Sequence, residues 1–161
     1  MLFLICTFFG HRNAPKEIEQ TLYSIIDNLI KKHNVRSYYV GNQGNFDYIV
    51  YRVLVKMAER YDIKYRVVLA YMPINNSFEY IEYFDTIIPD GIEKVPKRYA
   101  INYRNKWLIK KSDIVITYVN DTIASNAANF KGIAERQGKT IINICDDLTI
   151  TVTNCKCFDA K

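Results

Sequence analysis

The chain has 161 residues, of which 49% are hydrophobic and 24% are charged, and its net charge is +5. This composition excludes a disordered chain, and the length predicts a single domain, residues 1–161, with one core. The positive charge favours an anionic partner such as nucleic acid, a free nucleotide or a phosphosugar. Because the basic residues form no long tail, nucleic acid is the weaker of these alternatives.

Apolar runs and amphipathic repeats alternate along the chain. Continuous apolar runs predict buried strands, and apolar residues three and four apart predict helices. A weak alternation near the C-terminus predicts an additional edge strand within residues 146–161. We expect five strands within residues 2–9, 35–40, 64–72, 113–119 and 139–145. We expect helices within residues 15–34, 46–58, 98–111 and 127–137.

This alternation predicts an α/β fold: a single Rossmann-like, doubly wound sheet of about five parallel strands with helices on both faces. Right-handed crossovers place every strand-to-helix turn at the carboxyl ends of the strands, where ligands of such sheets bind. The segment 73–96 differs, because it combines turn residues with several aromatic residues. We predict that this segment forms a partly ordered aromatic flap, a common place for function.

Two strand-to-helix turns contain glycine, and both are candidate ligand-binding loops. The second strand runs into Gly41-Asn42-Gln43-Gly44, where glycines let the backbone approach a ligand and the next helix presents its free N–H groups. The first strand ends similarly, at Gly10. A tight turn without a ligand is the alternative, although two such turns in one domain favour binding.

Charged side chains accompany these turns. Arg12 is suited to hold a phosphate with two hydrogen bonds, or it is a surface arginine at the sheet edge. His11 is a candidate base or hydrogen-bond donor, and its alternative is a structural role at the strand end. Asp47 is a candidate acceptor for a ribose hydroxyl, but a carboxylate at a helix start is also stabilised by the helix dipole.

Further candidates come from the second half of the chain. Most basic side chains of the third predicted helix are expected to face solvent, whereas Arg104, beside Asn105, is expected to point inward. Ser125 and Asn126 precede a helix and offer contacts to a second phosphate. Tyr71, with the aromatic residues of the flap, is a candidate for stacking on a base.

No metal site, cofactor or membrane segment is expected. The four cysteines include an isolated C-x-C, Cys155 and Cys157, without a second pair at zinc-site spacing. The apolar opening of the chain has no basic leader and is too short to span a bilayer, so it predicts a core strand. Reduced thiols then indicate a cytoplasmic protein.

Segments 5–12, 39–47, 104–107 and 112–119 carry a family resemblance. They resemble the SLOG superfamily of Rossmann-like nucleotide-binding proteins, in the style of the short SLOG proteins of bacteria and their phages. That superfamily includes the LOG cytokinin phosphoribohydrolases, the DNA-processing protein DprA and ligand sensors of anti-phage systems. The match covers about residues 2–145, and Asp47 takes the acidic place of the Gly-Gly-x-x-Gly-x-Asp stretch of the DprA branch. The resemblance implies a nucleotide-type ligand and a homodimer joined by helices beside the site.

The chain departs from the LOG enzymes after the fourth predicted strand. Those enzymes carry a Pro-Gly-Gly-x-Gly-Thr-x-x-Glu loop, whose glutamate serves N-glycosidic cleavage. Residues 120–127 contain neither the glycines nor the glutamate. The fold therefore carries over from the resemblance, whereas phosphoribohydrolase activity of the LOG kind does not.

Three functions stay open, in descending order. The first is binding of a nucleotide, an ADP-ribose-type signal or a cyclic nucleotide, which in a phage or mobile element would sequester a signal of anti-phage defence. The second is hydrolysis of an N-glycosidic or phosphate bond in such a ligand, with His11 and Asp47 as catalytic candidates. The third is DprA-like binding of single-stranded DNA. Further candidate acids for the hydrolase are Glu79, Glu82, Asp85 and Glu93.

Overall fold

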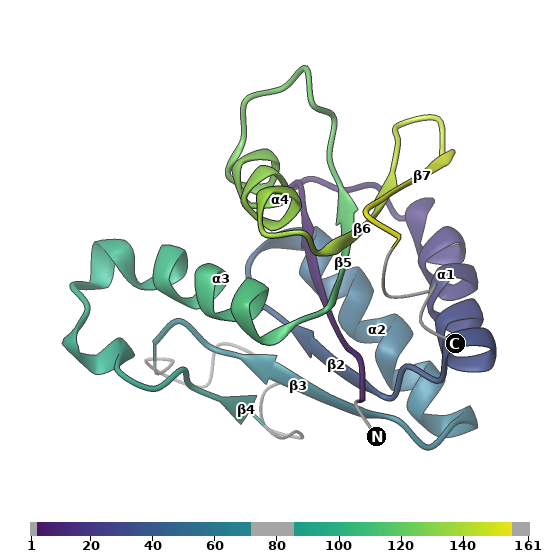
Figure 1. Ribbon diagram of the computed structural model, residues 1–161, viewed down its shortest axis with the longest axis horizontal. Helices are drawn as coiled ribbons and strands as arrows, with labels where there is room; N and C mark the ends of the chain where they lie inside the picture. The colour runs from purple at the N-terminus through teal and green to yellow at the C-terminus, as the bar shows by residue number, and fades with distance from the viewer. Residues whose placement is uncertain (1–2, 72–85, 156–161) are drawn as a thin grey trace.

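The computed structural model describes residues 3–71 and 86–155 (Figure 1). In these two ranges no helix has the length and apolar character needed to cross a membrane. Two 3₁₀ turns, Ile92–Lys94 and Lys97–Tyr99, precede the third α-helix. In chain order the described strands and α-helices are β1 (Ile5–Gly10), α1 (Ile18–His33), β2 (Ser37–Val40), α2 (Gly44–Arg60), β3 (Lys64–Val68), β4 (Thr86–Ile87), α3 (Ala100–Lys111), β5 (Ile114–Tyr118), α4 (Asn126–Arg136), β6 (Thr140–Ile144) and β7 (Ile150–Thr153).

The described strands form one seven-stranded sheet with the order β4-β3-β2-β1-β5-β6-β7. All neighbouring pairs from β4 to β6 are parallel, and β7 pairs antiparallel with β6. The predicted α/β fold with a mostly parallel sheet is therefore confirmed. The predicted number of about five strands is too low, because the two-residue β4 joins the sheet beyond β3. β7 lies within the range expected for the edge strand.

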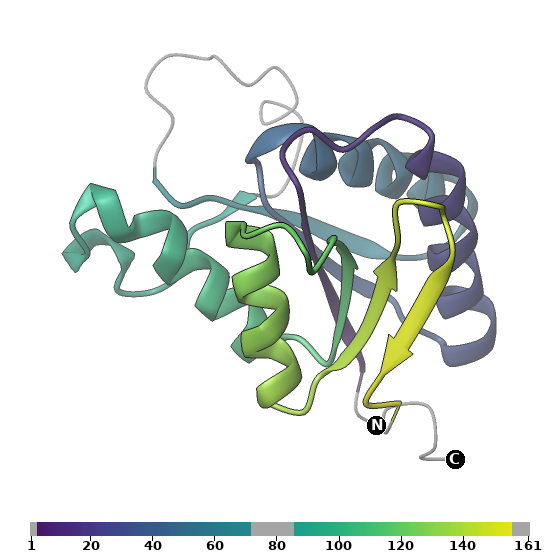
Figure 2. The ribbon, with the colours of Figure 1, turned by 90° about the horizontal axis from the view of Figure 1, so that it is seen from above.

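Helices cover both faces of the sheet, α1 and α2 on one and α3 and α4 on the other (Figure 2). Alternate residues of β1 point to opposite faces. Cys6 and Phe8 join the core beneath α1 and α2, whereas Phe9 joins the core beneath α3 and α4. β5 and β6 are buried along their whole length. This burial on two sides explains why both strands are rich in branched apolar residues, with Thr117, Thr140 and Asn143 as their buried polar positions.

The strand order reverses between β1 and β5. β1 continues through α1 to β2 on one side, whereas β5 lies on the other side of β1. The loops that follow β1 and β5 therefore lead to helices on opposite faces of the sheet (Figure 1). In open sheets of this kind the divergence of the two loops opens a crevice at the carboxyl ends of the strands.

The predicted aromatic flap falls mostly outside the described residues. Its aromatic residues Phe78, Tyr80, Tyr83 and Phe84 and three of its candidate acids, Glu79, Glu82 and Asp85, lie there. The described part of the flap contains β4 and the 3₁₀ turn Ile92–Lys94.

Candidate ligand-binding site

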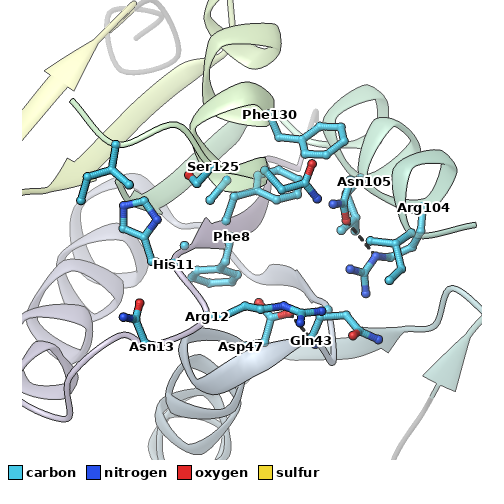
Figure 3. A pocket seen from close by; sticks show the side chains of 18 residues that line it. Phe8, His11, Arg12, Asn13, Gln43, Asp47, Arg104, Asn105, Ser125 and Phe130 are labelled. Atoms are coloured by element: carbon cyan, nitrogen blue, oxygen red, sulfur yellow. Dashed lines mark hydrogen bonds between the residues drawn. The ribbon is translucent and has the colours of Figure 1, made fainter. Parts of the chain in front are cut away.

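A pocket of about 340 Å³ opens at the carboxyl ends of β1, β2 and β5, where the strand order reverses. Its walls come from the end of β1, the β2–α2 turn, one face of α3 and the beginning of α4 (Figure 3). Ten of the thirteen residues predicted for the site line this pocket. They are Gly10, His11, Arg12, Gly41, Gln43, Asp47, Arg104, Asn105, Ser125 and Asn126.

The other three predicted residues lie outside the pocket lining. Asn42 is buried, and its Oδ1 accepts a hydrogen bond from Arg104 Nη1 at 3.3 Å. Gly44 begins α2 with a φ of 86°, a conformation that favours glycine. Tyr71 is 38% exposed, and the Lys97 ammonium lies 5.3 Å from its ring centroid. Asn42 and Gly44 thus belong to the β2–α2 turn that forms one wall of the pocket, although they do not line it themselves. Tyr71 is not part of the pocket lining.

Sequence reasoning missed the apolar part of the lining. On α3, Ile101 and Leu108 share a face with Arg104 and Asn105, because the four positions are spaced as i, i+3, i+4 and i+7. That helical spacing was the signal that could have found them. The full set of missed lining residues is Phe8, Phe9, Asn13, Ile101, Leu108, Ile123, Ala127 and Phe130.

The glycines at the strand ends make room for the protein's own side chains. A Cβ added at Gly10 would collide with the ring of Phe46. A Cβ added at Gly41 would lie 2.7 Å from both Arg104 Nη1 and Asp47 Oδ2. These two glycines therefore let buried side chains cross the strand ends, and they also line the pocket. That they let the backbone approach a ligand stays a prediction.

The N-terminus of α2 is partly satisfied by the protein itself. The Gln43 N–H donates to Asp47 Oδ2 at 2.9 Å, and the Asn45 N–H donates to the Arg12 carbonyl at 2.8 Å. These two N–H groups are not free to bind an anion, contrary to the expectation from the glycine-rich turn. The Asp47 carboxylate occupies the place that a bound phosphate would take at this helix.

Asp47 is the one carboxylate among the described lining residues. Its side chain projects from the first turn of α2, and the residue is 8% exposed. Burial raises the pKa of Asp47 to about 6, although the nearby Arg104 guanidinium and the hydrogen bond from Gln43 act in the opposite direction. An acid with this pKa changes its charge close to neutral pH, which suits it both to proton transfer and to hydrogen bonding.

Arg104 and Asn105 form a buried pair on α3. Arg104 is 3% exposed, as its predicted inward direction requires, and its Nε donates to Asn105 Oδ1 at 2.9 Å. Its Nη1 donates to the Val68 carbonyl at 3.1 Å, which joins α3 to the end of β3. Because Asn105 Oδ1 is occupied, the amide Nδ2 of this 5% exposed residue is the donor left for the pocket (Figure 3).

His11 joins the loops that follow β1 and β5. Its backbone N–H donates to the Tyr118 carbonyl at 3.1 Å, and its ring Nε2 accepts from the Asn120 N–H at 2.9 Å. A neutral imidazole that accepts at Nε2 carries its proton on Nδ1. In this arrangement Nε2 is occupied and the remaining ring nitrogen carries an N–H, so the geometry favours His11 as a hydrogen-bond donor over His11 as a base.

The loop after β5 is held in place by the polar side chains of β6 and of the turn that follows it. Asn143 accepts from the Val119 N–H and donates to the Val119 carbonyl, both at 3.1 Å. Asp146 accepts from Asn120 Nδ2 at 2.8 Å and from the Tyr118 hydroxyl at 3.1 Å. These bonds fix the loop that leads from β5 to the start of α4.

The N-terminus of α4 faces the pocket. Ser125 caps the helix, because its Oγ accepts from the Ala128 N–H at 3.1 Å. Asn126 and Ala127 of the first turn line the pocket, and that turn contains no acidic residue. The helix therefore places partial positive charge at the pocket without a carboxylate to offset it.

The remaining candidates lie elsewhere. Glu93 is exposed and takes no part in the pocket lining. Cys155 is exposed, and Cys157 lies outside the described residues. Within residues 3–71 and 86–155, no group of three or more His, Cys, Asp and Glu side chains is arranged to hold a metal ion. The basic side chains of the α3 region are exposed, as expected, at Lys94, Lys97, Arg98, Lys106, Lys110 and Lys111.

No protein-family model matches this chain, and no curated protein matches it.

Proposed function

We propose that the pocket binds a small phosphorylated ligand derived from a nucleotide. The Asn105 amide carries this proposal: the residue is 5% exposed, its Oδ1 is occupied, and its Nδ2 has no acceptor among the described residues. Among the described residues, Ser112 Oγ is the fully buried side-chain polar atom without a hydrogen-bond partner, so the Asn105 N–H groups are instead open to the pocket that the residue lines. A ligand oxygen in the pocket would supply the acceptor that Asn105 lacks.

The balance of charge in the pocket favours an anion. Arg12 and Arg104 belong to the lining, and the N-terminus of α4 adds partial positive charge. The ring N–H of His11 is a further, uncharged donor. Against these groups stands one carboxylate among the described lining residues, that of Asp47. A phosphoryl group, with several acceptor oxygens and negative charge, matches this set of donors.

The size and the apolar wall favour a compact ligand with one ring system. Phe8, Phe9, Leu108 and Phe130 belong to the pocket lining together with the polar groups and give it apolar character. The volume of about 340 Å³ lies near the lower end of the range of roughly 300–1,000 Å³ that is usual for small-molecule sites. A mononucleotide or phosphosugar therefore fits better than a complete dinucleotide.

The proposal also covers the cellular location, the oligomeric state and the biological role of the protein. The resemblance to SLOG proteins supports a nucleotide-type ligand, a cytoplasmic homodimer and, in a phage or mobile element, the capture of a defence signal. Binding without cleavage is the favoured activity, because the LOG glutamate is replaced and the geometry favours a donor role for His11.

Hydrolysis of the ligand is the second candidate, favoured by one observation. Asp47 lies in the pocket, and burial raises its pKa to about 6, a value suited to a general acid. Recovery of the ligand unchanged after incubation with the protein would support binding alone. Recovery of a free base, or of inorganic phosphate, would support the hydrolase.

Two measurements test the binding. Mass spectrometry of small molecules released from the purified, heat-denatured protein identifies any ligand that is carried through purification. Calorimetric titration with ribonucleoside monophosphates, ADP-ribose and cyclic nucleotides measures affinity directly. If no compound of the panel binds with a Kd below about 1 mM, the proposed function is wrong.

A matched pair of variants on α3 locates the binding. Asn105→Asp keeps the size of the side chain but replaces the amide donor at the pocket with a carboxylate, and should weaken binding about tenfold or more. Asn102→Asp makes the same change at an exposed position of the same helix and should leave the affinity unchanged. Equal affinities of the two variants would place the ligand outside this pocket.

A further inference from the structure

We infer that Asp47 selects the ligand by accepting a hydrogen bond from a sugar hydroxyl, so that the site takes ribose phosphates in preference to their deoxy counterparts. This inference rests on the proposed function, because it assumes that a phosphorylated ligand enters the pocket. It assigns opposite ends of the ligand to the two walls that Figure 3 shows, one with Gln43 and Asp47 and the other with Ser125 and Phe130.

The two helix N-termini at the pocket are not equivalent. At α2 the protein itself satisfies the Gln43 and Asn45 N–H groups and places a carboxylate in the first turn. At α4 the first turn contains no acidic residue, and Asn126 and Ala127 line the pocket. A phosphoryl group is therefore favoured beside α4, where the Asn105 amide supplements the helix and no carboxylate stands in the first turn. Beside Asp47 the carboxylate offsets the positive charge of Arg12 and Arg104, which lie near it.

The Asp47 carboxylate has acceptor capacity that the fold does not use. Its Oδ2 accepts from the Gln43 N–H at 2.9 Å, and no hydrogen bond reaches its Oδ1 from the described residues. A carboxylate has room for about four hydrogen bonds. Because Asp47 is 8% exposed and lines the pocket, the donor for Oδ1 has to come from the pocket side.

A hydroxyl group is the donor that fits this place. The opposite wall takes the anionic part of the ligand, so the group near Asp47 has to be an uncharged donor within the length of one phosphosugar. The vicinal hydroxyls of ribose meet that requirement. A site built to hydrogen-bond a hydroxyl discriminates against the analogue that lacks it, because the buried acceptor then stays unpaired.

The test compares ribose and deoxyribose ligands in calorimetric titrations. The probes are AMP, 2′-deoxy-AMP and 3′-deoxy-AMP, titrated into the wild type, Asp47→Asn and the control Asp62→Asn. Asp62 is exposed beyond the far end of α2, so its variant changes charge without touching the pocket. Wild type and the Asp62→Asn control should prefer AMP over at least one deoxy analogue by about 10–100-fold. In Asp47→Asn that preference should fall to about threefold or less, since a neutral amide is the weaker acceptor.

The outcomes separate this inference from the function on which it rests. If no probe binds the wild type, the proposed function fails and the inference fails with it. If all three probes bind the wild type equally, the pocket binds phosphates but Asp47 does not select a hydroxyl. If the preference for AMP survives in Asp47→Asn, another group recognises the hydroxyl and the inference is overturned.

Discussion

Replacing Asp47 with asparagine is expected to stabilise the fold at neutral pH. Burial raises the pKa of Asp47 from its ordinary value of 3.8 to about 6, more than Arg104 and the Gln43 N–H lower it. An acid whose pKa is raised on folding stabilises the folded state while it is protonated. Its contribution is therefore complete below pH 3.8 and is lost as the pH rises to about 6.

The magnitude follows from the two pKa values. The interval from 3.8 to about 6 corresponds to about 3 kcal/mol, at roughly 1.4 kcal/mol for each pH unit. Asp47→Asn should thus raise the free energy of unfolding by up to about 3 kcal/mol above pH 7, and by little below pH 4. Asparagine retains an oxygen for the Gln43 N–H, so the contact at the start of α2 is kept.

The assay is urea denaturation of the wild type, Asp47→Asn and the exposed control Asp62→Asn between about pH 4 and pH 8. The difference between Asp47→Asn and the wild type should grow over this interval, while the control stays within about 0.5 kcal/mol of the wild type throughout. A difference that is constant with pH would refute the reasoning. A loss of stability in Asp47→Asn above pH 7 would refute it as well, since it would show that the ionised carboxylate stabilises the fold.

Three further predictions concern two glycine substitutions and the position of the proton on the His11 ring. Gly10→Ala should destabilise the fold by about 1–3 kcal/mol in thermal denaturation, because the added Cβ collides with Phe46; an unchanged Tm would show that the ring can move aside. Gly132→Ala in α4 should instead stabilise by about 0.5–1 kcal/mol, since only the far end of a flexible side chain lies near the added Cβ; a lower Tm would contradict this. For His11, ¹⁵N NMR should place the imidazole proton on Nδ1, and a proton on Nε2 would rule out the bond from the Asn120 N–H.

The fold could be predicted because buried positions in helices and strands are occupied by apolar residues at regular spacing in the sequence. β5 and β6 are buried on both sides, and each is rich in branched apolar residues. α1 buries Ile18, Leu22 and Ile25 at the spacing from which the helix was expected. β4 could not be found in this way, because two residues are too few to show any period.

The convergence of the site residues was also accessible from the sequence. Parallel strands with right-handed crossovers bring the loops after β1, β2 and β5 to one edge of the sheet, whatever their side chains are. This rule alone placed His11, Gln43 and Ser125 together, and they do line one pocket.

The local chemistry of the site could not be predicted, because it depends on contacts between distant segments. Phe46 packs over Gly10, 36 positions earlier in the chain, and the Arg12 carbonyl occupies the Asn45 N–H. No spacing in the sequence indicates either contact. The sequence therefore predicted an anion site at the start of α2, where the structure places Asp47.

The most direct test of the pocket is an NMR titration of the ¹⁵N-labelled protein with the four ribonucleoside 5′-monophosphates. The account predicts saturable shifts of the Asn105 side-chain amide and of the Asn126 and Ala127 N–H groups, with no shift of the Asn102 side-chain amide on the outer face of α3. Binding that leaves the Asn105 amide unmoved, or no shift with any of the four nucleotides at millimolar concentration, would contradict it.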